Sequence, residues 1–383
     1  VVSTIAQIPV YAYHLRIFNL VEGEVVQVYF DVQQLYYIPQ YTPIQAQLEN
    51  AGVDCTYVFY LDENLESQQK KVAEKLGCEV KWVKSEPEAR QLYLASKPDW
   101  LLIGNYFSDL ELIHQHTKTG LLSHGIGPKA CYYSVSDSMP TVRFVEGPYR
   151  TKRLTELYPD SKFVDTGYAK LDPLINKANT FPGIENYGLD PNKKTILYAP
   201  TFYPSSIECI PKKFPEEFSD YNIIVKPHYF SLANDKYRKQ KNRLNHWANY
   251  KNVYLSSIDD VNILPFMGLA DVLISDASST LFEFAALNKP VVWCDFYKLR
   301  LGYRGIFKYR FEKRMDKDLY KYADIAVHAE GYKDLKKCVD SQIVNPDEKS
   351  KIRLQHTLAL AGIVDGEVSN RISSYIVSSG GHI

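Results

Sequence analysis

Several widespread functional signatures are missing from this 383-residue chain, and each absence narrows what the protein can do. No segment matches GxxxxGK(S/T), which excludes a P-loop nucleotide site. The opening strand is not followed by GxGxxG, which argues against a dinucleotide-dependent oxidoreductase. Neither HExxH nor GxSxG occurs, so a zinc protease of that type and an α/β-hydrolase are disfavoured as well. We predict no metal site.

Paired cysteines, net charge and long apolar runs are also lacking. The six cysteines are scattered without a CxxC, which favours reduced thiols and argues against a disulfide scaffold. The 45 basic and 45 acidic side chains balance, so no overall field attracts a polyanion, and we expect no nucleic-acid partner. No apolar run approaches the roughly 18 residues that span a bilayer. These features are typical of a cytoplasmic protein.

The chain does contain a regular alternation of short apolar runs and amphipathic segments. This alternation predicts an α/β fold built from two Rossmann-like parallel-sheet domains that face each other across a cleft. A polar, breaker-rich linker at residues 176–194 separates an N-terminal domain, residues 1–175, from a C-terminal domain, residues 195–383, which ends in a helical tail at about residues 348–377. The predicted strands are residues 25–30, 55–61, 79–83, 100–103, 120–123 and 163–166 in the first domain, and 195–199, 222–226, 253–256, 272–275, 291–294 and 325–327 in the second.

The most informative segment begins with the apolar run VLIS at residues 272–275, which is typical of a buried parallel strand. Asp276 and the hydroxyl cluster at residues 278–280 follow it. Thr280, with Glu283 three residues later, forms a capping-box pattern that places a helix N-terminus here. Unpaired backbone N–H groups at such a start can hold a phosphate or pyrophosphate. A Ser/Thr-capped helix without a ligand fits the same pattern, and both interpretations remain open.

A histidine on a glycine-flanked turn follows another predicted strand. His124 stands in the sequence SHGIG, and histidine is the side chain best suited to general-base chemistry near neutral pH. Gly125 and Gly127 would allow the backbone to approach a ligand closely. A structural histidine bonded to the backbone is the alternative.

Further polar residues occur where strands of the second domain are predicted to end. Lys226 and His228 follow an apolar run and could neutralise a diphosphate, or they could be a surface lysine and a loop-capping histidine. Thr201 could donate to a ligand oxygen or serve as a turn residue. Arg304, in the sequence GYRG, could bind a phosphate through two N–H groups or form a surface salt bridge.

Six segments in this order resemble the CDP-glycerol glycerophosphotransferase family, the teichoic-acid primases and polymerases. The resemblance covers roughly residues 100–340, and its segments are SHGIGPK, DTGYAKLDPL, TILYAPTF, IIVKPH, ADVLISDASSTLFEFAALNKPVV and GYRG. It implies a GT-B fold in which the acceptor lies on the side of the N-terminal domain and the nucleotide binds the C-terminal domain. It also implies transfer of glycerol phosphate, or another polyol phosphate, from CDP-glycerol or a related donor to an acceptor hydroxyl, with release of CMP.

The resemblance further assigns roles to individual residues. His124 would be the general base, and His228 would contact the diphosphate. The other donor-binding positions would be Lys226, Thr201, Asp276, Ser278, Ser279, Thr280 and Arg304. No cofactor is implied, because the CDP-activated donor is itself a substrate. The acceptor would be lipid-linked or a saccharide, in teichoic-acid or capsule synthesis.

A lipid-linked acceptor implies a peripheral position on the inner face of the bacterial cell membrane. The basic and aromatic run KYRKQKNRLNHW at residues 236–247 could contact anionic headgroups, although a solvated helix face fits it too. Two other enzyme classes share the expected two-domain fold: a GT-B nucleotide-sugar glycosyltransferase of capsule or lipopolysaccharide assembly, and a sugar-nucleotide 2-epimerase. A catalytically silent nucleotide-binding module is a third alternative.

Overall fold

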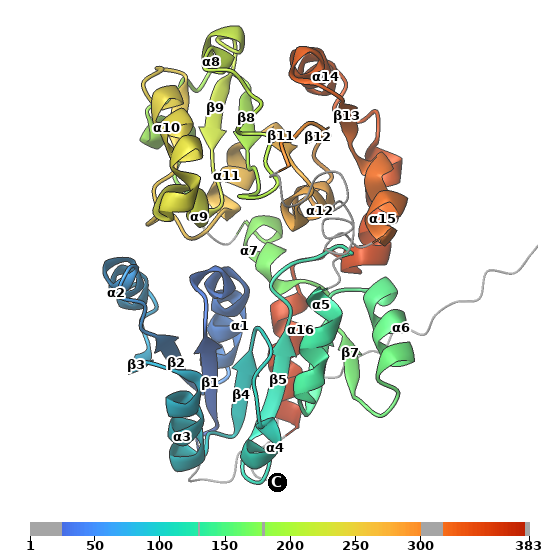
Figure 1. The fold of residues 1–383 in the computed structure, drawn as a ribbon. Coiled ribbons are helices and arrows are strands. Elements are labelled where there is room, and N and C mark those ends of the chain that lie inside the picture. The colour runs from blue at the N-terminus through green and yellow to red at the C-terminus, as the bar shows by residue number, and fades with distance from the viewer. Residues whose placement is uncertain (1–24, 129–130, 178–180, 300–316, 380–383) are drawn as a thin grey trace, which may run out of the picture.

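The computed structural model describes residues 25–128, 131–177, 181–299 and 317–379. These residues form two parallel β-sheets with helices packed on their faces, one sheet in each half of the chain (Figure 1). This arrangement confirms the prediction of two parallel α/β domains. None of the helices within the described ranges is long and apolar enough to cross a membrane.

The first sheet has seven strands among the described residues, in the spatial order β3-β2-β1-β4-β5-β6-β7, and every pairing is parallel. In chain order the strands are β1 (Gln27–Val32), β2 (Asp54–Tyr60), β3 (Glu79–Val83), β4 (Trp100–Ile103), β5 (Lys118–Leu122), β6 (Val142–Val145) and β7 (Phe163–Asp165).

The second sheet has six strands in the described part of the chain, in the order β10-β9-β8-β11-β12-β13, again parallel throughout. Its strands are β8 (Thr195–Tyr198), β9 (Asn222–Val225), β10 (Val253–Leu255), β11 (Val272–Ser275), β12 (Val291–Cys294) and β13 (Val327–Ala329). The predicted strand at residues 325–327 begins two residues too early, because the 3-10 helix η8 (Lys317–Ile325) occupies the start of that range.

Helices connect the strands and cover the sheets. Those in the first half are α1 (Ile38–Asn50), α2 (Glu66–Glu74), α3 (Glu86–Ser96), α4 (Leu110–Ile113), α5 (Cys131–Ser134), α6 (Pro148–Leu157) and α7 (Asp172–Ile175), with the short 3-10 helices η1 (Leu35–Tyr37) and η3 (Ala169–Leu171). Those in the second half are α8 (Phe214–Glu217), α9 (Tyr229–Ala233), α10 (Arg238–Trp247), α11 (Leu264–Leu269), α12 (Ser279–Ala286), α14 (Tyr332–Val344), α15 (Ser350–Ala361) and α16 (Val368–Ser378).

The strand order explains where a ligand can bind. In each sheet the chain moves outward from its first strand in one direction and then returns to add strands on the other side. The direction therefore reverses between β1 and β4 in the first sheet, and between β8 and β11 in the second. At such a switch point the connections leave in opposite directions, which opens a crevice at the carboxyl ends of the strands.

Burial follows from this architecture. The central strands β4, β8, β9, β11 and β12 are buried along their whole length, as expected for parallel strands that are covered on both faces. One core of the first domain contains α1 residues such as Ile44, and another contains α3 and α4 residues such as Tyr93 and Leu110. The edge strands β3 and β7 are only partly buried.

Strand β6 was not predicted from the sequence. Its four residues are completely buried, but the second of them is Arg143, which interrupts the apolar pattern that would reveal a strand. The Arg143 guanidinium donates hydrogen bonds to Ser136 Oγ at 2.5 Å and to the Tyr132 carbonyl at 2.7 Å. These contacts give both terminal nitrogens of the buried guanidinium a partner and make the strand possible.

The helical tail differs from its predicted place. The sequence suggests that it belongs to the C-terminal domain, and α15 does pack on α12. However, α16 crosses back and packs against α1, so that the red helix lies among the blue and green elements of Figure 1. Val368, Ile372 and Ile376 of α16 are buried in the same core as Ile44. Their apolar spacing indicates a helix but does not indicate which sheet it covers.

Candidate active site

A cavity of about 550 Å³ lies where the carboxyl ends of the two sheets face each other. The first domain contributes η1, the turn after β5 and Lys170 to its lining. The second domain contributes the segments that follow β8, β9 and β11. In the second domain the lining follows the switch-point strands β8 and β11, and in the first it follows β1 and β5, on either side of β4, so the cavity lies at the strand ends where the topology predicts a ligand.

The hydroxyl cluster forms the start of α12, although not with the predicted cap. Ser278 is the N-cap residue, in extended conformation, and its Oγ accepts a hydrogen bond from the Thr280 N–H at 3.3 Å. Ser278, Ser279 and Thr280 are half-buried and line the cavity. The positive end of the α12 dipole therefore faces the space between the domains.

The predicted capping box of Thr280 and Glu283 is wrong, because the helix begins two residues earlier than the pattern suggests. Glu283 does not fold back on the cap. Its Oε2 instead lies 2.6 Å from the Lys170 Nζ of the other domain, and the Tyr168 hydroxyl donates to its Oε1 at 3.4 Å. Glu283 and Lys170 both line the cavity.

Asp276 lies beneath the cavity, is only 2% exposed and is absent from the lining. Its carboxylate accepts hydrogen bonds from the backbone N–H groups of Thr201 at 3.1 Å and Ser206 at 3.2 Å. Burial raises the pKa of Asp276 to about 7, and the hydrogen bonds from the Ser206 loop oppose that rise. The residue therefore holds the loop after β8 in place, and the structure gives it no direct access to a ligand in the cavity.

Thr201 lines the cavity, as its predicted role requires. Its hydroxyl donates a hydrogen bond to the Pro204 carbonyl at 2.5 Å, so it acts as a turn residue too. A hydroxyl has one proton, so in this arrangement Thr201 serves as a turn residue. Donation to a ligand oxygen would require the hydroxyl to rotate away from Pro204.

Lys226 follows β9 and lines the cavity wall of the second domain. Burial lowers the pKa of its ammonium group to about 8, while Asp260 raises it and Lys170 lowers it further. The charge of a poorly solvated lysine is stabilised more by a neighbouring anion than the charge of an exposed lysine is.

His228 is the N-cap residue of α9, and its Nδ1 accepts a hydrogen bond from the Phe230 N–H at 3.3 Å. Since Nδ1 is an acceptor, the neutral ring carries its proton on Nε2. The ring packs against Phe202, Tyr229 and Phe230, with centroids 4.6, 4.9 and 5.0 Å away. These contacts fix the orientation of an imidazole that lines the cavity.

His124 approaches the cavity from the first domain, on the turn that follows β5. Its Nδ1 lies 3.4 Å from the Gly104 carbonyl, an arrangement that leaves Nε2 as the basic nitrogen of the neutral ring. The ring also contacts Tyr36, with centroids 5.0 Å apart, and Tyr132, at 5.1 Å. His124 is half-buried in an aromatic setting. Its contact with the Gly104 carbonyl fits a structural histidine, and its place in the cavity lining fits a general base.

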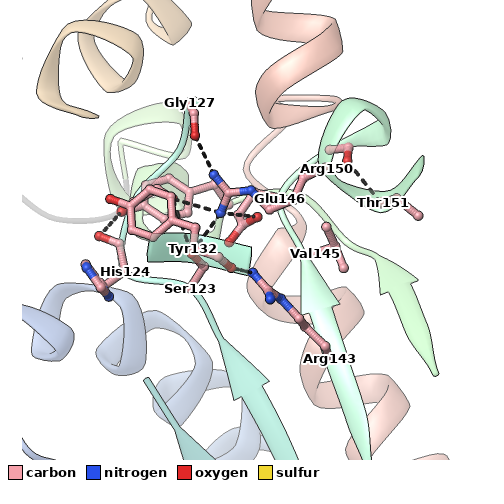
Figure 2. A network of polar contacts seen from close by, with 12 residues as sticks. Ser123, His124, Gly127, Tyr132, Arg143, Val145, Glu146, Arg150 and Thr151 are labelled. Atoms are coloured by element: carbon pink, nitrogen blue, oxygen red, sulfur yellow. Dashed lines mark hydrogen bonds and ion pairs between the residues drawn. The ribbon is translucent and has the colours of Figure 1, made fainter. Parts of the chain in front are cut away.

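A buried arginine holds the His124 turn from behind (Figure 2). The Arg150 guanidinium donates to the Ser123 Oγ at 2.9 Å and to the Gly127 carbonyl at 2.6 Å, and it forms an ion pair with Glu146 at 2.9 Å. It also lies 4.6 Å from the centre of the Tyr132 ring. Arg150 is 2% exposed, so these contacts act in a poorly solvated place where they are strong.

The two glycines of the turn allow it to press against α12. A Cβ on Gly125 would approach the Ser279 Oγ to 3.0 Å, and one on Gly127 would meet the Phe282 ring at 2.4 Å. Gly127 also has a φ of +92°, which favours glycine. Ile126 between them is buried in the core that is centred on α12. The His124 turn and the α12 start are therefore in direct contact across the domain boundary.

Arg304 lies outside the described residues. Within the described ranges, no group of three or more His, Cys, Asp or Glu side chains is arranged to hold a metal ion.

Sequence reasoning missed several residues that line the cavity. They are chiefly aromatic or paired side chains: Tyr36, Tyr132, Lys170, Tyr229, Asp260 and Glu283. Tyrosines occur 30 times in this chain, so an individual tyrosine gives no signal by itself. Lys170 and Glu283 do lie within segments that resemble the family, but their pairing depends on how the two domains meet.

Two Rossmann-like domains that share a cavity at their facing strand ends define a GT-B-type fold, and solved structures agree. The wall teichoic acid polymerase TagF matches with a TM-score of 0.60 and 18% identity, over 92% of this chain and 88% of that one. A UDP-GlcNAc 2-epimerase from Neisseria meningitidis, bound to UDP-GlcNAc, matches with a TM-score of 0.58 and 14% identity, over 93% of this chain and 100% of that one. Likenesses at this level of identity establish the fold alone.

Sequence comparison identifies the family. Residues 136–378 match the model of the CDP-Glycerol:Poly(glycerophosphate) glycerophosphotransferase family, and the chain belongs to this family. The teichoic acid poly(glycerol phosphate) polymerase of Bacillus spizizenii is 29% identical over 185 residues, which are 44% of this chain and 44% of that protein. The chain thus covers less than half the length of the curated relatives it matches.

The buried Arg150 network yields a prediction about stability. Arg150→Met should lower the free energy of unfolding by about 3–5 kcal/mol, because it leaves the Glu146 carboxylate buried without its partner. Urea denaturation followed by circular dichroism measures the change. Adding Glu146→Gln should recover part of the loss, whereas Lys152→Met, exposed on the same helix, should change stability by less than about 0.5 kcal/mol. An Arg150→Met loss as small as that of Lys152→Met would contradict the prediction.

Proposed function

We propose that this protein transfers a glycerol-phosphate or related polyol-phosphate group from a CDP-activated donor to an acceptor hydroxyl and releases CMP, in the synthesis of a cell-surface polymer such as teichoic acid. One observation carries the proposal beyond family membership. A candidate base from the first domain, His124, lines the same cavity as Lys226, His228 and the start of α12 from the second domain. A mere nucleotide binder has no need of a base across the cavity from its anion site.

The second domain supplies the donor side. A CDP-activated donor carries a diphosphate, and the groups suited to bind it are the Lys226 ammonium, the Nε2–H of His228 and the N–H end of α12. All three follow strands of one sheet, β9 and β11, so they converge at its carboxyl edge. We place Thr201 and the hydroxyls of residues 278–280 around the same phosphates.

The first domain supplies the acceptor side. In the proposed reaction the acceptor hydroxyl attacks the β-phosphorus of the donor, and His124 takes the hydroxyl proton as the new O–P bond forms. The bond from the β-phosphorus to the bridging oxygen breaks, and CMP leaves with that electron pair. The charge that spreads over the phosphoryl oxygens is stabilised by Lys226, His228 and the α12 dipole. No cofactor is required.

The alternatives with the same fold are less well supported. An epimerase needs a carboxylate free to exchange protons with a sugar. The acids in the described lining are Glu283, which Lys170 and Tyr168 bind, and Asp260, which accepts from the Ser257 N–H at 2.8 Å. A nucleotide-sugar transferase remains the second candidate, because the base and the anion site would serve it equally.

A donor panel tests the proposal. Purified protein is incubated with CDP-glycerol, CDP-ribitol, UDP-GlcNAc and a CMP-sugar together with a saccharide or lipid-linked acceptor, and released nucleotide is measured. We expect CMP from a CDP-polyol and no release from the sugar nucleotides. UMP or UDP release alone would overturn the assignment.

The same assay tests the role of His124. His124→Ala should lower kcat by about 10²–10⁴-fold, the usual contribution of a general base, while the Kd for CDP stays within about twofold. Isothermal titration with CDP provides the second measurement. A parallel loss of CDP affinity would place His124 in the donor site instead.

The lowered pKa of Lys226 predicts how CDP binding depends on pH. Below about pH 8 Lys226 of the free protein is mostly protonated, and its ammonium can bind the phosphates directly. Above about pH 8 Lys226 is mostly neutral and must take up a proton when CDP binds. The Kd for CDP should therefore rise up to about tenfold per pH unit above about pH 8, until the raised pKa of the complex is reached. Lys226→Arg should bind CDP without this dependence, because arginine stays charged. A wild-type Kd that is flat between about pH 7 and about pH 9.5 would contradict the prediction.

We also propose that an anionic membrane surface is a partner, as a lipid-linked acceptor requires. In α10 the apolar Leu244 and Trp247 are buried, while Lys239 and Lys241 are exposed. Reversing both lysines to Glu should weaken co-sedimentation with anionic vesicles at least about 30-fold, because each lysine lost removes about 1 kcal/mol and each Glu adds repulsion. Lys333→Glu with Lys337→Glu on α14 is the matched charge control. Equal partitioning of the two double variants would remove α10 from the contact.

A further inference from the structure

The Lys170–Glu283 pair joins the two domains inside the cavity. Lys170 belongs to η3 in the first domain, and its Nζ lies 2.6 Å from the Glu283 Oε2 on α12 of the second domain. The Lys170 side chain is 12% exposed and that of Glu283 2% exposed. Both residues nevertheless line the cavity. The pair therefore stands at the edge of the proposed donor site rather than on the outer surface.

A buried ion pair is a poor way to hold two domains together. Removing both charges from water costs several kcal/mol, and well-packed apolar residues of similar volume usually stabilise as well or better. The surrounding interface already has such residues, since Ile126, Tyr168 and Leu171 of the first domain are buried in the core around α12. Holding the domains together therefore does not explain why Lys170 and Glu283 are charged, and their charges imply another role.

The carboxylate of Glu283 is held chiefly through Oε2. Lys170 contacts Oε2, while the Tyr168 hydroxyl lies 3.4 Å from Oε1 and 3.0 Å from the His124 carbonyl oxygen. Tyr168 is 2% exposed, so this arrangement is sheltered from solvent. Glu283 consequently forms a fixed anchor for the Lys170 ammonium, close to the turn that carries His124.

The ammonium group of Lys170 has capacity for a second anion. It has three N–H donors, and Glu283 is the acceptor that the described residues provide. Lys226 lies near enough on the opposite wall for the charge of Lys170 to lower its pKa. Two ammonium groups from opposite domains, with the α12 start beside them, suit an anion of more than one charge.

We propose that Lys170 is a second cation for the donor's diphosphate, contacting the β-phosphate from the side of the first domain, and that Glu283 is a positioning residue that holds the Lys170 ammonium there. The assignment rests on the proposed function, because it names a further contact within that donor site. In this arrangement the diphosphate contacts Lys170 from the first domain and Lys226 from the second.

The test compares two nucleotides that differ by the phosphate in question. Isothermal titration measures the Kd for CDP and for CMP, and their ratio reports the contact with the β-phosphate. Lys170→Met should lower the preference for CDP over CMP about 10- to 100-fold, the range expected for a charged hydrogen bond. Lys170→Arg should retain the preference within a few fold. Lys213→Met, which removes a lysine from the exposed Lys213–Glu217 pair, should leave it unchanged.

Glu283 is tested through Lys170. Glu283→Ala should lower the same preference, and the double variant with Lys170→Met should lose no more than Lys170→Met alone, because Glu283 acts only by placing the ammonium. An interface role would weaken CDP and CMP binding equally, and the preference for CDP over CMP would stay unchanged in both single variants; losses of that preference that add in the double variant would show that Glu283 does not act through Lys170. Either result would overturn the inference. Lys170→Gln serves in place of Lys170→Met if circular dichroism shows that the latter does not fold.

The outcomes separate this inference from the proposed function. A wild-type protein that binds CDP no better than CMP, and that releases no CMP from a CDP-polyol, overturns both. Suppose instead that the wild-type protein prefers CDP and releases CMP from a CDP-polyol. A CDP preference that then survives Lys170→Met overturns only the role of Lys170.

Discussion

The contact between the His124 turn and the start of α12 is the constraint on which the rest of the site depends. Gly125 and Gly127 bring the backbone of one domain against side chains of the other, and Ile126 between them is buried in the core around α12. A side chain at either glycine would separate the surfaces. Because the turn follows β5 and the helix follows β11, this contact sets two sheet edges against each other with an imidazole and a helix N-terminus between them.

Such a turn exposes carbonyl groups to the protein interior, where each needs a donor. Arg150 provides donors for the Ser123–Gly127 turn, and Glu146 balances its charge. In the second domain the supporting group is an acceptor instead of a donor: the buried Asp276 carboxylate accepts hydrogen bonds from backbone N–H groups of the loop after β8. Each wall of the cavity is thus held by buried ionisable side chains that do not themselves line the cavity. Rigid support of this kind keeps groups preorganised for a developing charge.

The sequence predicted what is local and missed what depends on packing. The apolar runs and breakers located nearly every strand, and seven predicted site residues, among them His124 and His228, line one cavity. Strand β6 was hidden by Arg143, whose burial becomes favourable only through its tertiary hydrogen bonds. Glu283 was assigned to a helix cap because its sequence spacing fits, yet the Lys170 ammonium of the other domain binds it. No pattern along one chain segment reveals a partner that lies 113 residues away.

The return of α16 to the first domain means that the polypeptide links the domains twice, once before β8 and once between α15 and α16. At the second link the backbone of Leu360 and Ala361 passes so close to Gly147 that a Cβ on Gly147 would meet it at 2.8–2.9 Å. Two links restrict the rotation of one lobe against the other more than a single link would, so the second crossing helps to keep the faces that line the cavity in register.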